Sequence, residues 1–544
     1  MPVSSPSPTS PKSGVIEASA PFPADSAIQT LGDVVRYHGK HRPEALATWQ
    51  EGRSTSYREL DARASRIAQA LIAHGLGKGD RVVFVGKNSD SYYELLFGCA
   101  KAGVVLVPAS WRLAVAELSY ILNDCRAPIV FTDRFCADTV VQIGAIAQTV
   151  IAMDRAMDGW LTFADWRDAH PADDPKTTLV PDDIGLQLYT SGTAGRPKGA
   201  QISHANLNWA CLGPHSLGEA WAQWADGDVS LVALPMSHIS GTGWGYMGYY
   251  FGVLNVILSE FEPSAALAAI ARHRVTKLLV VPAALRFMLA HPDVETTDFS
   301  SLRHLVYGAS PIPLDLLRQA IKIVGCDFCQ LYGLTETTGP IVTLPPEDHD
   351  PAGTPRMRSA GRPYPNVELR IRKAGGALAT TREIGEIETR SPYNVRGYWN
   401  LPEATAAAWT TDGWLKTGDA GYIDEDGYVF IQDRISEMIV SGGENIYPAE
   451  VESAIFGHPD VADVAVIGVP DRKWGEAVKA LVVLNPGRQI DAASIIAFAR
   501  QNLAAFKAPK SVDFIDSLPR NPSGKIMRRV LRAPYWEGRD RQIN

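Results

Sequence analysis

The chain has 544 residues, of which 46% are hydrophobic and 21% charged, as is usual for a globular protein. Its formal net charge of −8 argues against a protein that follows nucleic-acid phosphates, because such proteins carry a basic balance. No run reaches the roughly 18 apolar residues that a membrane-spanning helix needs. We therefore expect no nucleic-acid partner and no integral membrane association.

Residues 1–26 are rich in proline and serine and lack the regions of a signal peptide, so we expect a disordered leader. The six cysteines are few and mostly scattered, which is typical of thiols in a reducing compartment and predicts a cytoplasmic protein. Cys326 and Cys329 form one CxxC inside an alternating, strand-like run. We interpret this pair as core cysteines, since a zinc site would need two further ligands nearby.

Helices and strands alternate through the first part of the chain. Helices are predicted at 61–74, 91–102, 265–273 and 313–324, and strands at 81–86, 104–108, 229–234, 277–281 and 304–307. This alternation indicates mostly parallel sheets that are covered by helices on both faces.

The pattern changes near Val367 to short alternating strands, predicted at 368–372, 385–389 and 427–432, with Gly and Asp turns between them. They indicate an antiparallel or barrel-like subdomain. After Arg434 helices at 448–456 and 492–502 flank strands at 461–469 and 477–484. We expect an α/β and α+β fold, with a large domain over 27–434 that combines helix-flanked sheets and a barrel-like subdomain, and a small α+β domain over 435–544.

A glycine-rich loop follows the apolar stretch 184–189, with the sequence Tyr189-Thr-Ser-Gly-Thr-Ala-Gly-Arg-Pro-Lys-Gly199. Glycines let backbone N–H groups converge on an anion, hydroxyls add donors, and the lysine adds a positive charge. The loop therefore predicts a polyphosphate site, although its spacing is not that of a Walker A loop. The expected contacts are Thr190, Ser191, Gly192, Thr193 and Lys198.

A second glycine pattern, Gly243-Trp-Gly-Tyr-Met-Gly248, matches G-x-G-x-x-G. It lies well past the strand predicted at 229–234, and no acidic residue follows it at about 20 positions, as a dinucleotide site requires. We do not interpret it as a dinucleotide loop.

The Tyr189–Gly199 loop resembles the signature of the acyl-adenylate-forming superfamily, which includes acyl-CoA synthetases, firefly luciferase and nonribosomal-peptide adenylation domains. Further motifs of that family follow in order: Tyr332-Gly-Leu-Thr-Glu-Thr-Thr-Gly339, Thr417-Gly-Asp419 with Asp433-Arg434, Ser441-Gly-Gly-Glu-Asn-Ile-Tyr-Pro448 and Asn521-Pro-Ser-Gly-Lys525. The resemblance, most of all to fatty-acid–CoA ligases, covers essentially everything after the leader. It implies a mobile C-terminal domain and two half-reactions. A carboxylate attacks the α-phosphate of ATP to give acyl-AMP and pyrophosphate, and a thiol, usually coenzyme A, then displaces AMP.

The resemblance also implies roles for single residues. Lys525 would be the catalytic lysine, which stabilises charge in the adenylation transition state. Glu336 would hold Mg²⁺, and Thr335 would donate to the α-phosphate. His238 would lie at the mouth of the acyl pocket. The alternatives are a surface charge for Lys525, an exposed turn carboxylate for Glu336 and a structural histidine for His238.

The nucleotide would lie between two further groups of residues. Asp419 would accept from the ribose hydroxyls with Arg434 beside it, unless the two form a surface ion pair. The adenine pocket would consist of Gly308, Ala309 and Ser310, with Tyr332 stacked on the base.

Coenzyme A would be bound by the C-terminal domain. Gly442 and Gly443 belong to a motif that resembles the coenzyme A ligase version, whose small residues would line a pantetheine tunnel. Basic and aromatic side chains suit the phosphate-bearing end of coenzyme A, with a solvated face as the alternative: Arg472, Lys473, Trp474, Lys507 and Lys510. One departure lies at the hinge, where the family has Lys or Asp two residues after Arg434 and this chain has Ser436, followed by Glu437.

The acid itself is inferred from Ile239–Gly248, where four glycines stand among Trp244, Tyr246 and Met247, and no charged residue occurs from Pro235 to Ser259. We expect an apolar, fairly long pocket, although the glycines could instead serve close helix packing. The stretch Ala233–Met236 lacks the acidic residue that would pair an amino-acid ammonium group.

These observations together predict an AMP-forming acyl-CoA ligase that uses ATP, Mg²⁺ and coenzyme A, and acts on a medium- or long-chain fatty acid. The alternatives are an aryl, phenylpropenoate or alicyclic acid–CoA ligase, a stand-alone adenylation enzyme that loads a carrier protein, and an acyl-AMP binder or light-emitting oxygenase. Whether the chain forms a homodimer stays open.

Overall fold

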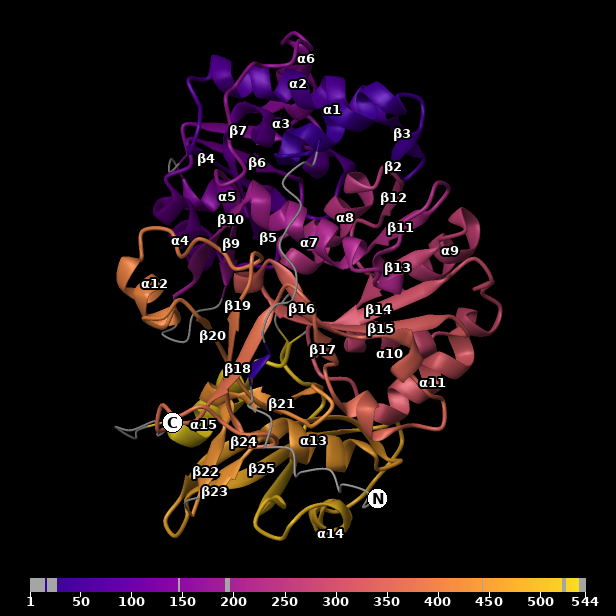
Figure 1. The fold of residues 1–544 in the computed structure, drawn as a ribbon, viewed down its shortest axis with the longest axis vertical. Coiled ribbons are helices and arrows are strands. Elements are labelled where there is room, and N and C mark those ends of the chain that lie inside the picture. Colours follow the sequence, from indigo (N-terminus) through magenta and orange to yellow (C-terminus); the bar gives the residue numbers. More distant parts are fainter. Residues whose placement is uncertain are drawn as a thin grey trace, which may run out of the picture.

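The computed structural model describes residues 15–16, 27–144, 147–190, 196–442, 444–520 and 525–537. Over these ranges the strands form four sheets, with helices packed around them (Figure 1). The expected mixed fold, with a large N-terminal part and a smaller C-terminal part, is confirmed. Within the same ranges every helix is too short or too polar to cross a bilayer.

The first sheet has the order β10-β9-β5-β4-β6-β7-β8 and is parallel apart from the β9–β10 hairpin. Its strands are β4 (Arg81–Gly86), β5 (Val105–Ser110), β6 (Ile129–Thr132), β7 (Thr149–Ala152), β8 (Leu161–Thr162), β9 (Ile184–Thr190) and β10 (Lys198–Ser203). The helices of this region are α2 (Tyr57–Ala73), α3 (Asp90–Ala102), α4 (Val115–Cys125), α5 (Ala137–Ile143) and α6 (Phe163–Asp168).

The second sheet has the order β17-β16-β15-β14-β13-β11-β12-β2-β3, parallel in its centre and antiparallel at both ends. Its strands are β2 (Leu46–Gln50), β3 (Arg53–Ser56), β11 (Val229–Val232), β12 (Leu254–Ile257), β13 (Lys277–Val280), β14 (His304–Gly308), β15 (Asp327–Leu334), β16 (Gly339–Leu344) and β17 (Arg362–Pro363). Its helices are α1 (Leu31–His41), α7 (His204–Ser216), α8 (Ile239–Tyr250), α9 (Pro263–His273), α10 (Pro282–Ala290) and α11 (Leu314–Val324).

One hydrophobic core joins the first two sheets. It contains Leu106 of the first sheet, Val306 of the second and Tyr246 of α8, all fully buried. Helix α8 is apolar around most of its surface, as a helix enclosed by other elements has to be. The alternating pattern of the sequence therefore predicts this part of the fold correctly.

The expected barrel-like subdomain takes the form of an antiparallel sheet in the order β1-β18-β19-β20-β21. Its strands are β1 (Val15–Ile16), β18 (Glu368–Arg372), β19 (Gly385–Arg390), β20 (Leu415–Ile423) and β21 (Val429–Arg434), and helix α12 (Pro402–Ala408) precedes β20. Strand β1 comes from the expected leader, and the other residues of 1–26 lie outside the described residues.

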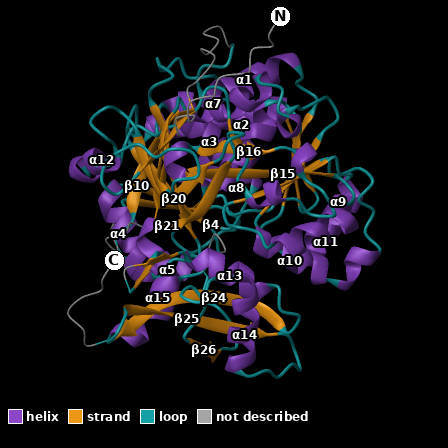
Figure 2. Cartoon of the chain, turned by 60° about the horizontal axis from the view of Figure 1, so that its bottom comes forward, coloured by secondary structure: helices purple, strands orange, loops and turns teal. Residues whose placement is uncertain are grey.

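The last sheet has the order β23-β22-β25-β24, with β26 parallel to β25. Figure 2 shows it as a layer of its own beside the N-terminal sheets. Its strands are β22 (Ile439–Ser441), β23 (Glu444–Ile446), β24 (Val461–Asp471), β25 (Gly475–Leu484) and β26 (Ser511–Phe514), with helices α13 (Pro448–Phe456), α14 (Ala492–Asn502) and α15 (Arg528–Trp536). We call residues 439–537 the C-terminal unit and residues 27–434 the N-terminal unit. The turn η6 (Ile435–Glu437) links them.

The two cysteines of the CxxC motif lie at the start of β15 and belong to different clusters. Cys329 is buried in the main core, whereas Cys326 packs against the cluster around α9 to α11. Burial raises the pKa of the Cys326 thiol to about 12. No group of three or more metal-ligating side chains occurs among the described residues. The interpretation as a core cysteine is confirmed for Cys329, and Cys326 is half-buried at the edge of its cluster.

Candidate active site

The β9–β10 hairpin positions the described ends of the glycine-rich loop. Thr190 and Lys198 are register partners, so the two residues face each other across the hairpin. The predicted contacts Ser191, Gly192 and Thr193 lie outside the described residues. The Lys198 ammonium lies 5.0 Å from the centre of the Tyr398 ring. Both hairpin ends thus lead toward one polar cluster.

Glu336 is the centre of that cluster. It follows β15 in the short turn η3 (Thr335–Thr337), where the Leu334 N–H donates to Thr337 Oγ1 at 2.8 Å. Its Oε1 accepts from the Tyr398 hydroxyl at 2.9 Å and from the Thr190 hydroxyl at 3.3 Å. Burial, then the charge of Glu336, raises the pKa of Tyr398, which keeps this hydroxyl a donor. Thr335 is partly exposed beside Glu336.

Tyr398 was not predicted as a site residue. Its segment adds to the edge of β10, because the Gln201 N–H donates to Gly397 O at 2.9 Å and the Trp399 N–H donates to Gly199 O at 2.8 Å. The sequence signal is weak, since an aromatic residue after a glycine occurs in many loops. Only the fold shows that this segment pairs with the end of the glycine-rich loop.

Asp419 is buried and held on both oxygens. Arg434, its register partner across β20 and β21, places Nε 2.9 Å from Oδ1, and the Tyr332 hydroxyl donates to Oδ2 at 2.7 Å. Burial raises the pKa of Asp419, and Arg434 opposes that shift. Arg434 also donates to Thr417 O at 2.9 Å. The alternative of a surface ion pair is wrong for Asp419, which is 5% exposed.

The predicted adenine pocket lies at the end of β14. A Cβ on Gly308 would lie 2.3 Å from Leu331 O of β15, so the close strand pairing requires glycine there. Ala309 has φ of 67°, in the left-handed region that costs a non-glycine residue about 1 kcal/mol. Ala309 is exposed and Ser310 half-buried. Ligands of α/β sheets bind at such carboxyl ends of parallel strands.

His238 precedes α8, and its Nε2 is buried without a hydrogen-bond partner among the described residues. Burial, and after it the charges of Lys525 and Arg112, lowers the pKa of His238 to about 4. The imidazole is therefore neutral at pH 7. A buried nitrogen without a hydrogen-bond partner destabilises the folded protein unless a ligand or water forms a hydrogen bond with it.

Lys525 of the C-terminal unit lies in the same electrostatic neighbourhood. Its side chain is exposed, yet desolvation and the charge of Arg434 lower its pKa, while Asp419 and Glu336 oppose that shift. The structure thus brings Lys525 toward His238, Asp419 and Glu336 from the other side of the linker.

The residues predicted for coenzyme A lie in the C-terminal unit. Gly442 has φ of 62°, and its N–H donates to Trp474 O at 2.8 Å. A Cβ on Gly442 would lie 2.6 Å from Cε3 of the Trp474 ring, so glycine lets that ring approach. Lys507 pairs with Glu450 at 2.6 Å and would have to leave it to bind a phosphate. Gly443 lies outside the described residues.

The glycines after His238 do not line a long cavity as predicted. They lie in α8, where an added Cβ would meet close neighbours: Pro235 O at 2.2 Å for Gly241, the Tyr93 hydroxyl at 1.9 Å for Gly245 and Asn255 Oδ1 at 2.3 Å for Gly248. The large side chains between them are buried in the core. The alternative of close helix packing is correct for these three glycines. Because the G-x-G-x-x-G pattern lies inside this helix, it forms no strand-to-helix dinucleotide loop.

Gly243 differs from these three. A Cβ there would meet only the Ile239 side chain, at 3.5 Å, and a Cβ on Gly339 at the start of β16 would likewise meet only Ile239, at 3.9 Å. Ile239 and Gly243 lie one turn apart on α8. Gly243 and Gly339 thus have room for a side chain beside Ile239, whereas the other three glycines of α8 do not.

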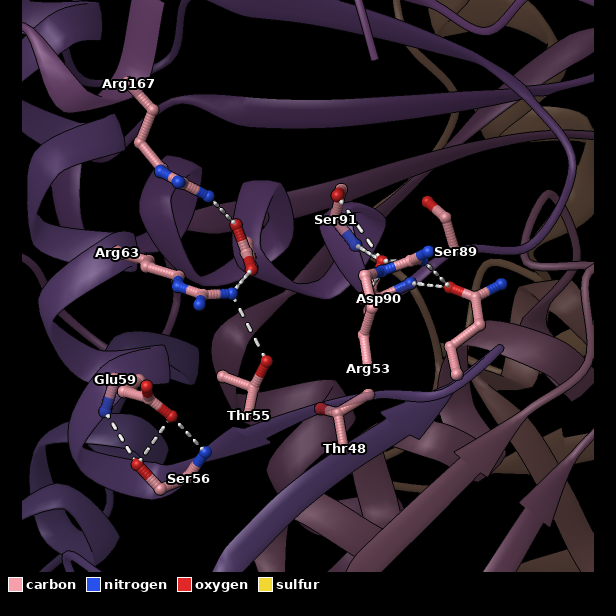
Figure 3. A network of polar contacts seen from close by, with 12 residues as sticks. Thr48, Arg53, Thr55, Ser56, Glu59, Arg63, Ser89, Asp90, Ser91 and Arg167 are labelled. Atoms are coloured by element: carbon pink, nitrogen blue, oxygen red, sulfur yellow. Dashed lines mark hydrogen bonds and ion pairs between the residues drawn. The ribbon is translucent and has the colours of Figure 1, made fainter. Parts of the chain in front are cut away.

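A second polar cleft, of about 430 Å³, lies among α2, α3 and α6 (Figure 3). Three arginines line it, and each pairs with a carboxylate: Arg53 with Asp90 at 3.2 Å, and Arg63 and Arg167 with Glu94, each at 2.7 Å. Arg167 also pairs with Asp168 at 2.7 Å, so three carboxylates face the three arginines. The cleft is therefore a structural ion-pair network and not an anion site.

The sequence matches two family models. One, described as AMP-binding enzyme, matches residues 35–399, and the other, described as AMP-binding enzyme C-terminal domain, matches residues 450–525.

Three relatives are similar over most of their length. The fatty acid–[acyl-carrier-protein] ligase ScoC of Streptomyces coeruleorubidus is 43% identical over 95% of this chain and 98% of its own. A feruloyl-CoA synthase of Amycolatopsis sp is 39% identical over 93% and 99%. The long-chain-fatty-acid–CoA ligase FadD13 of Mycobacterium tuberculosis is 36% identical over 88% and 93%.

The fold is similar to that of MatB from Rhodopseudomonas palustris in two states. The ATP-bound structure has a TM-score of 0.84 at 33% identity, covering 93% of this chain and 99% of that one. The apo structure has a TM-score of 0.75 at 34% identity over the same shares. The TM-score is thus higher for the ATP-bound structure than for the apo structure.

Proposed function

We propose that this chain, which belongs to the AMP-binding enzyme family, joins a hydrophobic carboxylic acid to a thiol through an acyl-adenylate. Its class is that of the AMP-forming acid–thiol ligases, and ATP or AMP binding comes with the family. The finer proposal is a medium- or long-chain fatty acid as substrate and coenzyme A as thiol. The single observation that carries the proposal is the convergence of Thr190 and Tyr398 on Glu336.

Glu336 suits Mg²⁺. The ion prefers one or two carboxylates together with phosphate oxygens over a cage made only of protein groups. The hydrogen bonds from Thr190 and Tyr398 both go to Oε1, so Oε2 could meet a cation. When bound, Mg²⁺ would neutralise phosphate charge. Lys198 and the described end of the glycine-rich loop would supply further contacts to the phosphates.

In the proposed adenylation step a carboxylate oxygen of the acid attacks the α-phosphorus, and the bond to pyrophosphate breaks. Negative charge grows on the α-phosphate oxygens, where the Lys525 ammonium would stabilise it more than in the ground state. Asp419, fixed by Arg434 and Tyr332, would accept from the ribose hydroxyls. Neutral His238 would orient the acid without adding charge to the pocket mouth.

The open face of α8 supports the substrate proposal. Gly243 and Gly339 have room beside Ile239, the residue that follows His238, and no charged residue occurs from Pro235 to Ser259. Two of the similar relatives are named for fatty acids. The feruloyl-CoA synthase supports an aryl acid as the second candidate.

A carrier protein is the second candidate for the thiol. The relative with 43% identity is named for an acyl-carrier-protein acceptor, whereas FadD13, at 36%, is named for coenzyme A. Both acceptors present a pantetheine thiol, so the Gly442 motif suits either.

One experiment separates these proposals. The purified protein is offered ATP, Mg²⁺ and a panel of carboxylic acids, and pyrophosphate release is measured without thiol, then AMP release with coenzyme A or with a phosphopantetheinylated carrier protein. We expect adenylation of medium- and long-chain acids, and AMP release that depends on coenzyme A. AMP release with the carrier protein and not with coenzyme A would make the carrier protein the acceptor. No pyrophosphate release with any acid would overturn the proposed function.

A further inference from the structure

The loop that carries Lys525 is closed at its base. Arg520 and Ile526 form an antiparallel bridge, and the Met527 N–H donates to Pro519 O at 2.8 Å. Residues 521–524 lie outside the described residues. An arginine stands on each side of this closure, Arg520 before Lys525 and Arg528 after it. The position of Lys525 thus depends on what holds these two side chains.

Arg528 begins α15 and is surrounded by three carboxylates. It forms a two-pronged pair with Glu452 of α13, from Nη2 to Oε2 at 2.8 Å and from Nε to Oε1 at 3.3 Å, and a close pair with Glu437 of the linker. Its Nη1 also lies 3.9 Å from Asp433 at the end of β21. The side chain is only 14% exposed, so these interactions are poorly screened.

These three contacts differ in which side of the linker they reach. Glu452 belongs to the C-terminal unit, as Arg528 does, so a rotation of that unit carries the pair along. Asp433 belongs to the N-terminal unit and also accepts from the Ala449 N–H of α13 at 2.8 Å. A rotation about the linker breaks the contacts of Asp433 and leaves the pair with Glu452 intact.

The other side of the loop has a similar connection. Asp463 of β24 accepts from Arg520 Nη2 at 2.7 Å and pairs with Arg286 of α10 at 3.3 Å. Arg286 also donates to Ala462 O at 2.6 Å. Arg286 lies in the N-terminal unit, and Asp463 and Arg520 in the C-terminal unit. Each side of the Lys525 loop is therefore tied across the boundary between the units.

We propose that Arg528 is a positioning residue for adenylation: together with Asp433 and Glu437 it holds the C-terminal unit in the arrangement that presents Lys525 to the α-phosphate, and Arg286 with Asp463 forms the second tie. The inference rests on the proposed function and on the mobile C-terminal domain that the family resemblance implies, with Ser436 of η6 at the expected hinge. The positive charge of Arg528 attracts three nearby carboxylates, those of Asp433, Glu437 and Glu452. Without it their mutual repulsion disfavours this arrangement, because like charges that are held together in a poorly screened site oppose one another.

The test compares Arg528→Gln with Arg532→Gln as its matched control. Arg532 lies one turn further along α15 and pairs with Glu476 at 3.2 Å inside the C-terminal unit. Each full-length variant is assayed for acid-dependent ATP–pyrophosphate exchange with decanoate, and for thioester formation from supplied decanoyl-AMP and coenzyme A. We expect Arg528→Gln to lower the kcat of exchange about 10- to 100-fold at little changed KM for ATP, because a misplacement near 1 Å costs about that much. Thioester formation should stay within about twofold, and Arg532→Gln should leave both steps near wild type.

Two further variants separate positioning from general damage. Arg528→Lys should restore part of the exchange rate, because it returns the charge without the two-pronged geometry. Arg286→Gln should lower exchange in the same direction and by less. Equal losses in both half-reactions, or equal effects of Arg528→Gln and Arg532→Gln, would overturn the proposal.

Hydrogen–deuterium exchange tests the same proposal without turnover. The Ala449 amide donates to Asp433 across the boundary, so its protection in the ligand-free protein reports the tie. Arg528→Gln should speed its exchange about tenfold, and Arg532→Gln should not. Unchanged protection of the Ala449 amide in Arg528→Gln would contradict the proposal, even if the protein adenylates no acid. If the wild-type protein shows no ATP–pyrophosphate exchange, that result alone would contradict only the proposed function.

Discussion

The Tyr398 hydroxyl donates to Glu336 Oε1 at 2.9 Å and so ties the edge of β10 to the turn after β15. This bond joins two segments that the sequence keeps 62 residues apart. It fixes one oxygen of the carboxylate, and the proposed cation would bind the other.

Glu336→Gln keeps an acceptor for Tyr398 and removes the charge. We expect adenylation to fall about 100-fold, in the range of a lost preorganised electrostatic contact, and the Mg²⁺ concentration for half-maximal rate to rise. Pyrophosphate exchange at varied Mg²⁺ measures both. Tyr398→Phe should have a smaller effect and lower the adenylation rate about tenfold, because it removes one hydrogen bond to a charged group. A normal Mg²⁺ dependence in Glu336→Gln would contradict the assigned cation site.

Gly243→Leu and Gly241→Leu test where the acyl space lies. Gly243 has room on one side, so leucine there should shorten the preferred acid, and each excluded methylene should cost about 0.8 kcal/mol or fourfold in kcat/KM. Gly241 has no such room, because its Cβ would lie 2.2 Å from Pro235 O. Leucine there should lower the melting temperature instead. A chain-length series and thermal melts measure the two effects, and an unchanged chain-length profile in Gly243→Leu would place the pocket elsewhere.

Ser436→Pro should hold the enzyme in one arrangement. Ser436 is the middle residue of η6, and proline fixes φ near −65°, close to the value of such a turn. Proline would therefore oppose a large rotation at this residue. Acyl-AMP should form at a near-normal rate while acyl-CoA formation drops at least tenfold. Wild-type rates in both half-reactions would show that the pivot lies at another residue.

His204 makes stability depend on pH. It is fully buried, and burial lowers its pKa to about 4. Between pH 6.5 and 4 the imidazole of His204 is protonated in the unfolded chain but stays neutral in the folded protein. The free energy of unfolding therefore falls as the pH falls through this window, by about 1.4 kcal/mol per pH unit. His204→Gln removes that proton uptake. Its melting temperature should drop less than that of the wild type between pH 7 and 5, and parallel drops would contradict the assignment.

Much of the fold and part of the site could be predicted from sequence patterns. Alternating strands and helices predict the two large sheets. The family motifs predict that Asp419 and Arg434 lie side by side, and the two are register partners across β20 and β21. Their biochemical roles, like the domain limits, the cytoplasmic location and the oligomeric state, stay predictions.

Three features could not be predicted because they depend on contacts between distant segments. The glycines of α8 sit in an apolar run with no helical period, so the sequence does not show that Tyr93 and Asn255 fill the spaces beside them. Tyr398 has no motif of its own. Arg528 belongs to a basic run that indicates surface charge, yet its partner Glu452 lies 76 residues away and encloses it.

The central claim is that Lys525 serves adenylation and not thioester formation, and Lys525→Ala measured in both half-reactions tests it most directly. We expect acid-dependent pyrophosphate exchange to fall by about two to three orders of magnitude, the loss typical of one preorganised charge. Thioester formation from supplied acyl-AMP should stay within about twofold of wild type. Equal losses in the two half-reactions, or a wild-type exchange rate, would contradict the account.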